Sequence, residues 1–152
     1  MPSRADLPDR SRRHLSPEVR KRVMSSIRKT DTKPELALRS ALRRVGLRGY
    51  RIHVRRMPGN PDIVYTRWKV AIFVDGVFWH GRPDYFQFGT KGEYWDQKIA
   101  GNIERDAKVN RALSDLDWEV LRFWDVDIMA DPSPAVCAIA EALKSRGRDV
   151  TV

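Results

Sequence analysis

Two apolar runs joined by a short basic turn constrain the fold of this chain most strongly. Residues 63–65 (IVY) and 70–74 (VAIFV) are rich in β-branched and aromatic side chains, and the second run contains no polar residue. A run of this kind is typical of a strand that is buried on both faces. Only the residues TRWK separate the two runs, so we predict that they pair as an antiparallel hairpin at the centre of the fold.

An acidic residue stands at the open end of each predicted strand. Asp62 follows Pro61 at the start of the first strand, and Asp75 precedes Gly76 at the end of the second. Because the start of one antiparallel strand lies beside the end of the next, the hairpin brings the two carboxylates together. His80 comes shortly after, behind two aromatic residues. Pro-Asp and Asp-Gly are also common in plain turns, but carboxylates that converge beside a histidine favour metal-assisted hydrolysis of a phosphodiester.

The overall charge of the chain favours a polyanionic partner. The 152 residues carry a formal net charge of +9, although solubility alone can account for part of this excess. The length indicates one domain, expected over residues 16–146, between a flexible basic arm (1–15) and a C-terminal tail (147–152). The single cysteine, Cys137, excludes an internal disulfide. No apolar run approaches a membrane span, so we expect a cytoplasmic, nucleoid-associated protein without membrane contact.

Capping residues and apolar periodicity predict the remaining elements. Thr32 and Glu35 have capping-box spacing, and Gly46 ends the apolar periodicity that follows them. The predicted elements besides the hairpin are helices over residues 16–28, 33–45, 93–116 and 134–144, and strands over 50–54 and 118–124. Helices that flank a mixed sheet place the chain in the α/β class.

The order of these pieces resembles that of the very short patch repair (Vsr) endonucleases, which nick DNA beside a T:G mismatch. The segments that carry the resemblance are DTKPE (31–35), residues 47–53, PGNPDIV (58–64), FWHG (78–81), EYW (93–95) with KI (98–99), NIERD (102–106), and WEVL (118–121) with Trp124. The resemblance implies a restriction-endonuclease-like α/β fold of the PD-(D/E)XK superfamily, with a central mixed β-sheet flanked by α-helices. It also implies a Mg²⁺-dependent endonuclease whose partner is double-stranded DNA.

By this resemblance, the expected Mg²⁺ ligands are Asp62, Asp75 and the backbone carbonyl of Val74, around one or two ions. Members of the family usually have histidine where this chain has Asp75. A carboxylate there either forms a like-charge pair that raises one pKa, or completes a divalent-metal site with Asp62. We favour the metal site, because the wider nuclease fold normally supplies a second acid on the adjacent strand.

His80 is the expected general base, since an imidazole can accept a proton from water near pH 7. In the family, the acid that matches Glu35 approaches this histidine, so Glu35 is expected to orient His80, to cap its own helix, or to do both. Asp106 and Asn102 lie one helical turn apart, which places them on one face of the predicted helix. We expect Asp106 to take part in catalysis, with Asn102 beside it near the metal and the DNA.

A structural zinc site is not expected in this chain. Family members hold zinc through three cysteines and a histidine, and structural zinc requires ligands of this kind. The positions that align with those ligands hold Val77, Arg82, Asp84 and Val126, and Cys137 lies elsewhere. The apolar side chains of Val77 and Val126 are expected to meet where two thiolates share the metal in the family.

The residues expected to contact DNA are aromatic and basic. In the family, an aromatic cluster wedges into the base stack beside the mismatch, where unstacking costs least. Trp95, at helical spacing with Ile99, also fits a plain core position. Arginines of the N-terminal arm would bind DNA phosphates. The expected contacts are Phe78, Trp79, Trp95, Arg12, Arg13, Arg55, Arg56, Lys98 and Asn102.

Three function classes stay open from the sequence. The first is a mismatch-directed nicking endonuclease, expected to act as a monomer and to have a functional link to a DNA cytosine methyltransferase. The second is a restriction or defence endonuclease on the same scaffold that acts on paired or modified DNA. The third is a DNA-binding module that does not cleave. The presence of Asp62, Asp75, His80 and Glu35 argues against the third class, because a protein that only binds DNA has no need of them.

Overall fold

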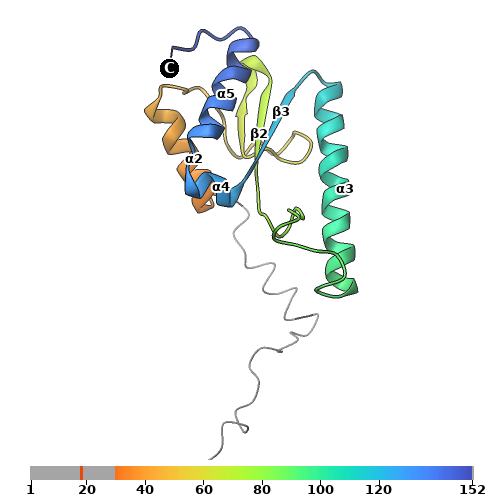
Figure 1. The fold of residues 1–152 in the computed structure, drawn as a ribbon. Coiled ribbons are helices and arrows are strands. Elements are labelled where there is room, and N and C mark those ends of the chain that lie inside the picture. Colours follow the sequence, from red (N-terminus) through yellow and green to blue (C-terminus); the bar gives the residue numbers. More distant parts are fainter. Residues whose placement is uncertain (1–17, 19–29, 152) are drawn as a thin grey trace, which may run out of the picture.

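The computed structural model describes residue 18 and residues 30–151 of the chain. Its elements in chain order are α2 (Lys33–Arg44), β1 (Ile63–Tyr65), the 3-10 helix η3 (Thr66–Trp68), β2 (Val70–Asp75), α3 (Glu93–Asp115), β3 (Glu119–Trp124), α4 (Asp125–Ala130) and α5 (Ser133–Ser145). Figure 1 shows a sheet with helices on both sides. The α/β class predicted from the sequence is confirmed. The predicted arm, with Arg12 and Arg13, lies outside the described residues.

The predicted hairpin forms part of a three-stranded sheet in the order β1-β2-β3. β1 pairs antiparallel with β2, so that Ile63 lies opposite Ile72 and Tyr65 opposite Val70. β3 pairs parallel with β2. The short η3 helix makes the turn, and Lys69 closes it in the left-handed conformation. β2 is therefore the central strand, as expected from its uninterrupted apolar sequence, which fits a strand buried on both faces.

Alternate residues of β2 face two different helical layers, because side chains alternate across a strand. Val70, Ile72 and Val74 pack in a core that α2, α4 and α5 complete. Ala71 and Phe73 pack on the other face, against α3. Figure 1 shows α3 by itself on one side of the sheet, with α2, α4 and α5 on the other. Both faces of β2 are thus buried.

The face of the sheet that looks toward α3 carries the polar residues of interest. Asp75 comes two residues after Phe73 on β2 and so shares its face. The Asp62 amide donates to the Ile72 carbonyl at 2.9 Å, which continues the hairpin by one residue and sets Asp62 beside Phe73. Arg122 of β3 is the register partner of Phe73. Two acids, Asp62 and Asp75, and one cation, Arg122, therefore lie on the face of the sheet that is turned toward α3.

Two elements differ from the prediction. The strand expected over residues 50–54 is reduced to a single bridge between Arg51 and Val64. His53 has a φ of 57°, which lies outside the extended region and prevents a longer strand. Helix α4 is absent from the predicted elements, because its six residues are too few to show apolar periodicity. Within the described part of the chain, no helix combines the length and the apolar character needed to cross a membrane.

Candidate active site

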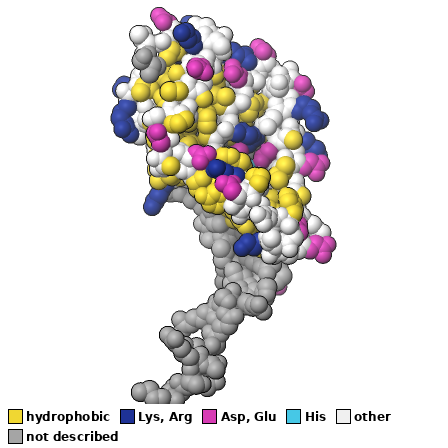
Figure 2. Space-filling view, in the orientation of Figure 1, with side chains coloured by type: hydrophobic (Ala, Val, Ile, Leu, Met, Phe, Trp, Pro, Cys, Tyr) yellow, Lys and Arg dark blue, Asp and Glu magenta, His cyan; other side chains and the backbone are white. Residues whose placement is uncertain are grey.

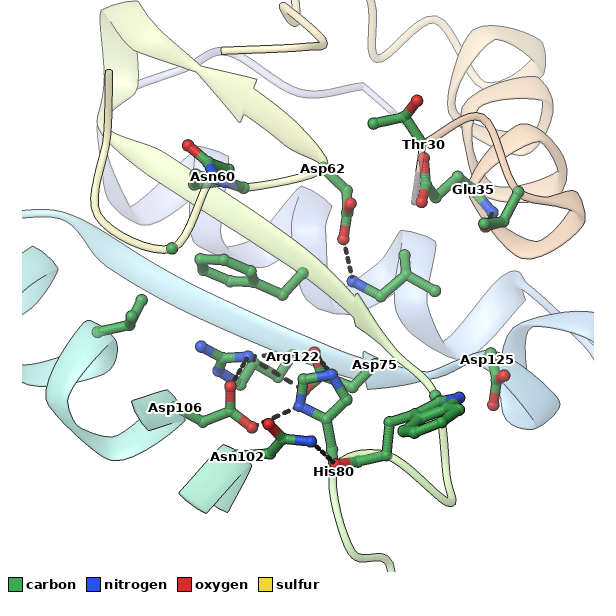
Figure 3. A pocket seen from close by; sticks show the side chains of 18 of the residues that line it. Thr30, Glu35, Asn60, Asp62, Asp75, His80, Asn102, Asp106, Arg122 and Asp125 are labelled. Atoms are coloured by element: carbon green, nitrogen blue, oxygen red, sulfur yellow. Dashed lines mark hydrogen bonds and ion pairs between the residues drawn. The ribbon is translucent and has the colours of Figure 1, made fainter. Parts of the chain in front are cut away.

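A cleft of about 900 Å³ lies between the sheet and α3 at the end of β2. The start of α2, the chain before β1, the end of β2 and one face of α3 line it (Figure 3). The five residues expected to take part in catalysis share this cleft: Glu35, Asp62, Asp75, His80 and Asp106. Their roles follow from how the structure pairs them.

Asp62 is held at the end of the hairpin. Its Oδ2 accepts a hydrogen bond from the backbone amide of Val74 at 2.7 Å. Burial raises the pKa of Asp62 to about 7; the hydrogen bond from Val74 opposes this shift, and the negative charges of Glu35 and Asp75 add to it. A carboxyl group in this environment gains most from a bound cation, because the cation would stabilise its charged form.

Glu35 lies on the Asp62 side of the cleft, across from His80 (Figure 3). The Thr32 hydroxyl accepts a hydrogen bond from the Glu35 amide at 3.5 Å, and Oε2 of Glu35 accepts one from the Asp31 amide at 2.9 Å. These contacts cap the start of α2, as the capping-box spacing predicts. Glu35 is buried, and its charge acts on Asp62. The structure therefore supports the capping alternative and places Glu35 away from the expected partner.

Asp106 of α3 takes the place beside His80 that was expected for Glu35. Nδ1 of His80 lies 2.5 Å from Oδ2 of Asp106, and Nε2 lies 3.8 Å from Oδ1 of Asp75. Burial is the largest single influence on His80 and lowers its pKa. The hydrogen bond to Asp106 and the charges of both acids outweigh burial, so the pKa of His80 is raised above its ordinary value. The geometry pairs His80 with Asp106.

Asp75 is held by Arg122, a residue that the sequence analysis did not single out. Nη1 of Arg122 donates to Oδ1 and Oδ2 of Asp75 at 3.1 and 3.2 Å. Burial raises the pKa of Asp75, and the positive charges of His80 and Arg122 counteract part of this rise. An arginine inside the apolar strand sequence VLRFW was the available signal, since a buried cation requires an acidic partner. The contacts of Asp75 thus differ from the expected sharing of a metal with Asp62.

Asn102 fixes the loop that follows β2. Its Nδ2 donates to the backbone carbonyl of Trp79 at 2.9 Å, so it contacts the chain next to His80. Gly81 lets the same loop approach α3 closely, because a Cβ there would lie 2.8 Å from Ile99 and 2.7 Å from Ile103. Gly81 also has a φ of 69°, which favours glycine. The loop that carries His80 is therefore anchored on both sides of the histidine.

The three aromatic residues expected at the DNA interface form one cluster. The Phe78 ring lies 5.4 Å from that of Trp79 and 5.1 Å from that of Trp95, and the two tryptophans are 5.6 Å apart, measured between ring centroids. All three side chains are half-buried. Trp95 therefore belongs to this cluster and not to a separate core position. Phe86 extends the cluster, with its ring 5.5 Å from Phe78.

The positions that align with the family's zinc ligands are joined by polar contacts. Oδ1 of Asp125 accepts hydrogen bonds from the Val77 amide at 3.3 Å and from the Val126 amide at 2.8 Å. Arg82 contacts Asp84 at 2.9 Å and Asp127 at 3.0 Å. The loop after β2 and α4 are thus joined through a carboxylate and a guanidinium. The expected contact between the side chains of Val77 and Val126 stays a prediction.

The basic residues expected to bind phosphate differ in position. Lys98 and Arg55 line the cleft, whereas Arg56 is exposed and does not line it. Arg105 of α3 also lines the cleft and was not predicted. On the face drawn in Figure 2, Lys and Arg side chains are scattered among acidic ones and form no single patch. The cleft, more than the overall charge, therefore indicates where a phosphate backbone would lie.

Comparison with known proteins identifies relatives across most of the chain. The model of the family DNA mismatch endonuclease Vsr matches residues 13–85. The type II nicking enzyme V.NaeI of Lentzea aerocolonigenes is 43% identical over 129 residues, which cover 82% of this chain and 76% of that protein. The type II nicking enzyme V.HpaIIP of Haemophilus parainfluenzae is 40% identical, with 87% and 96% covered.

A third relative carries the family's own name. The DNA mismatch endonuclease Vsr of Escherichia coli (strain K12) is 37% identical over 109 residues, which cover 70% of this chain and 69% of that enzyme. The residues that the family model matches, 13–85, include the hairpin, the cleft acids on it and the helix that carries Glu35. On the strength of these matches and of the α/β architecture, the chain belongs to the DNA mismatch endonuclease Vsr family of endonucleases, which have the restriction-endonuclease-like fold.

Proposed function

We propose that this protein is a Mg²⁺-dependent endonuclease that nicks one strand of duplex DNA next to a T:G mismatch. One observation carries the proposal: an acidic pair, half-buried Asp62 and buried Glu35, faces a hydrogen-bonded His80–Asp106 pair across one cleft. Hydrolysis of a phosphodiester needs both a centre that neutralises phosphate charge and a base that takes a proton from water. The two pairs match these two needs.

The acidic pair fits a divalent cation. Carboxylate and carbonyl oxygens are the ligands that Mg²⁺ prefers, and Asp62 together with the backbone carbonyl of Val74 would supply them. The neighbouring charge of Glu35 strengthens the attraction for a cation. When bound, Mg²⁺ would stabilise negative charge on the scissile phosphate and lower the pKa of a nearby water. We assign Asp75 to the His80 side instead, because Arg122 already occupies both of its oxygens.

His80 is placed to act as the general base. With Asp106 as hydrogen-bond acceptor at Nδ1, the imidazole keeps its proton on that nitrogen, and Nε2 has a free electron pair. His80 lines the cleft, so Nε2 can accept a proton from water beside the phosphate. Asp106 stabilises the imidazolium that results, in the manner of the acid in a catalytic triad.

The aromatic cluster supports recognition of a distorted base step. Phe78 and Trp79 follow β2 and come just before His80, and Trp95 of α3 packs against both rings. Flat apolar side chains that enter a base stack unstack a mismatched step more cheaply than a paired one. Lys98, Arg55 and Arg105 would hold the phosphates on either side. One cleft in one chain fits a monomer that cuts a single strand, and a functional link to a DNA cytosine methyltransferase remains part of this proposal.

A second candidate is a nicking endonuclease that acts on paired or modified DNA. The two relatives V.NaeI and V.HpaIIP are named type II nicking enzymes, and this name does not mention a mismatch. The catalytic arrangement would be the same in both cases. The two functions therefore differ only in the substrate, and only a comparison of substrates separates them.

Cleavage of a labelled duplex with one T:G mismatch, set beside its fully paired twin, tests the proposal. We expect a nick in the strand that holds the mismatched T, only in the presence of Mg²⁺, and no nick with Asp62→Asn. The mismatch should be varied in its flanking sequence, so that a context requirement is not mistaken for inactivity. Equal cleavage of the paired duplex would support the second candidate. Cleavage that persists in excess chelator, or in Asp62→Asn, would contradict the metal role.

A further inference from the structure

Arg122 is the least expected charged residue in the sheet. It lies in β3 between Leu121 and Phe123, which pack in the main core, and its side chain is 18% exposed. Burial of a guanidinium is costly unless every part of it finds a partner. The partners of Arg122 therefore show what the residue does.

Those partners come from two other elements that line the cleft. Nε donates to Oδ1 of Asn110 on α3 at 2.7 Å, and the guanidinium carbon lies 4.1 Å from the ring centroid of Phe73 on β2. Nη1 donates to both carboxylate oxygens of Asp75 and lies 3.6 Å from Oδ1 of Asp106. Asn110 and Phe73 fix the plane of the guanidinium, so its charge has one position between the two acids.

The two acids that Arg122 contacts are the two that flank His80. Asp106 uses Oδ2 for Nδ1 of His80 and turns Oδ1 toward Arg122. Asp75 places Oδ1 3.8 Å from Nε2 of His80. Without a cation between them, the buried carboxylate of Asp75 and the half-buried carboxylate of Asp106 would repel each other beside one imidazole. Figure 3 shows the four residues as one connected group on the side of the cleft opposite Asp62.

The same group has the spacing of a metal site. One ligand atom each from Asp75, His80 and Asp106 lie within 4.8 Å of one another, which is close enough for one cation. The guanidinium of Arg122 already supplies a positive charge to both carboxylates there. A divalent ion at this position would have to displace it.

We infer that Arg122 is a positioning residue of the cleavage site: its guanidinium stands where a second metal ion would stand, and it holds Asp75 and Asp106 so that His80 keeps one tautomer. This inference rests on the proposed function for its catalytic meaning. It reduces the expected one or two Mg²⁺ ions to one, on the Asp62 side. By the same inference, Asp106 is the group that orients His80, and Arg122 holds Asp106 in place.

The test compares Arg122→Met with Arg122→Lys and with the matched control Arg146→Met. Methionine keeps the length and the packing on Phe73 without the charge, and lysine keeps the charge without the contact to Asn110. Arg146 is a similarly half-buried arginine, 25% exposed and paired with Asp117 and Glu119 outside the cleft. All variants are checked for folding by circular dichroism and thermal melting before use.

Two readouts are taken on each variant. Long-range ¹H–¹⁵N NMR spectra of the imidazoles, assigned with His80→Gln, report the tautomer of His80 without any need for activity. Single-turnover cleavage and DNA affinity are measured on the mismatched duplex. For Arg122→Met we expect a mixed tautomer of His80 and a loss of cleavage rate on the order of 100-fold, with DNA affinity within about threefold. Arg122→Lys should recover part of both, and Arg146→Met should match the wild type in both.

A wild-type tautomer and a wild-type cleavage rate in folded Arg122→Met would each overturn the inference. If Arg122→Met fails to fold, the double variant Asp75→Asn/Arg122→Met replaces it, because it also removes the acid that would be left unpaired. A wild-type tautomer of His80 in the double variant would equally overturn the inference. Failure of the proposed function would give another result: the wild-type protein would leave both duplexes uncut. The NMR comparison would still show whether Arg122 sets the tautomer of His80.

Discussion

On one side of the cleft Asp62 and Glu35 lie close together, and on the other side Asp75 and Asp106 flank His80 and Arg122. Both sides contain two buried or half-buried acids. Within residues 30–151, however, none of the ion pairs includes Asp62 or Glu35. Asp75 and Asp106 are thus paired with Arg122 and His80, whereas Arg39 and His53 at the other end of the cleft pair with Asp31 and not with Asp62 or Glu35. This difference supports the proposal that an external cation binds on the Asp62 side.

The largest effect should come from Asp62→Asn. The amide can still accept the hydrogen bond from Val74, but it cannot offer a carboxylate to a cation, so we expect cleavage to fall on the order of 1000-fold or more. Single-turnover cleavage of the mismatched duplex measures this loss, and DNA affinity without Mg²⁺ serves as the control. A cleavage rate of Asp62→Asn within tenfold of the wild-type rate would contradict the metal-binding role of Asp62.

Asp106→Asn should have the next largest effect, about 100-fold on cleavage. The charge and hydrogen bond of Asp106 help to raise the pKa of His80, and the histidine must be neutral to act as a base. Wild-type cleavage should therefore fall as the pH drops through a value above the ordinary pKa of histidine, and Asp106→Asn should move this fall to lower pH. Glu35→Gln is the matched variant from the other side of the cleft. A larger shift of the pH profile in Glu35→Gln than in Asp106→Asn would reverse the pairing described above.

A smaller effect concerns stability without metal. The pKa of Asp62 is about 7 in the folded protein against 3.8 as the ordinary value, so the folded state holds this proton more tightly than the unfolded state. Its contribution therefore lowers stability as the pH rises from about 4 to about 7, and the full penalty remains above that range. Asp62→Asn removes the penalty. We expect the variant to be more stable than the wild type at pH 8, on the order of 2 kcal/mol, and equal to it near pH 3.5.

Urea unfolding of the two proteins in chelator, from pH 3.5 to pH 8, measures this difference. Taking the difference between variant and wild type cancels the other titrating acids. A wild type that exceeds Asp62→Asn in stability at pH 8 without metal would show that Asp62 already has a partner, and the contrast between the two sides of the cleft would then fail.

The smallest effect is expected at Asp125, which lines the cleft but belongs to neither group of acids and joins the loop after β2 to α4. Asp125→Ala removes the acceptor for the amides of Val77 and Val126, which should cost about 1 kcal/mol of unfolding free energy. Asp125→Asn keeps an acceptor oxygen and should cost less. Thermal melting of both variants checks this order, and equal melting temperatures would mean that these hydrogen bonds do not hold the loop.

Local patterns were enough to predict the hairpin and to bring Asp62 and Asp75 into one cleft, because the turn between the strands is short and the second strand is uniformly apolar. They were also enough to place Asn102 and Asp106 on one face of a helix. The pairing of Asp75 with Arg122 spans 47 residues and depends on the parallel register of β3 with β2. No local pattern fixes that register, so the arginine was missed.

The choice between Glu35 and Asp106 as the partner of His80 had the same difficulty. Glu35 has a local role that its spacing reveals, the capping of α2. Which acid reaches His80 depends on how closely the loop packs on α3, and that packing depends on Gly81 and Asn102. The resemblance to the family identified the candidate catalytic residues. Only the folded structure shows which of them lie on the Asp62 side of the cleft and which on the His80 side.

The most direct test of the central contrast is the effect of Mg²⁺ on the melting temperature of the wild type, Asp62→Asn and Asp75→Asn at pH 8 without DNA. A ligand that binds only the folded protein raises its melting temperature. We predict that Mg²⁺ raises the melting temperature of the wild type and of Asp75→Asn, and leaves that of Asp62→Asn unchanged. Loss of the Mg²⁺ effect in Asp75→Asn, with the effect retained in Asp62→Asn, would place the metal on the His80 side and contradict the account.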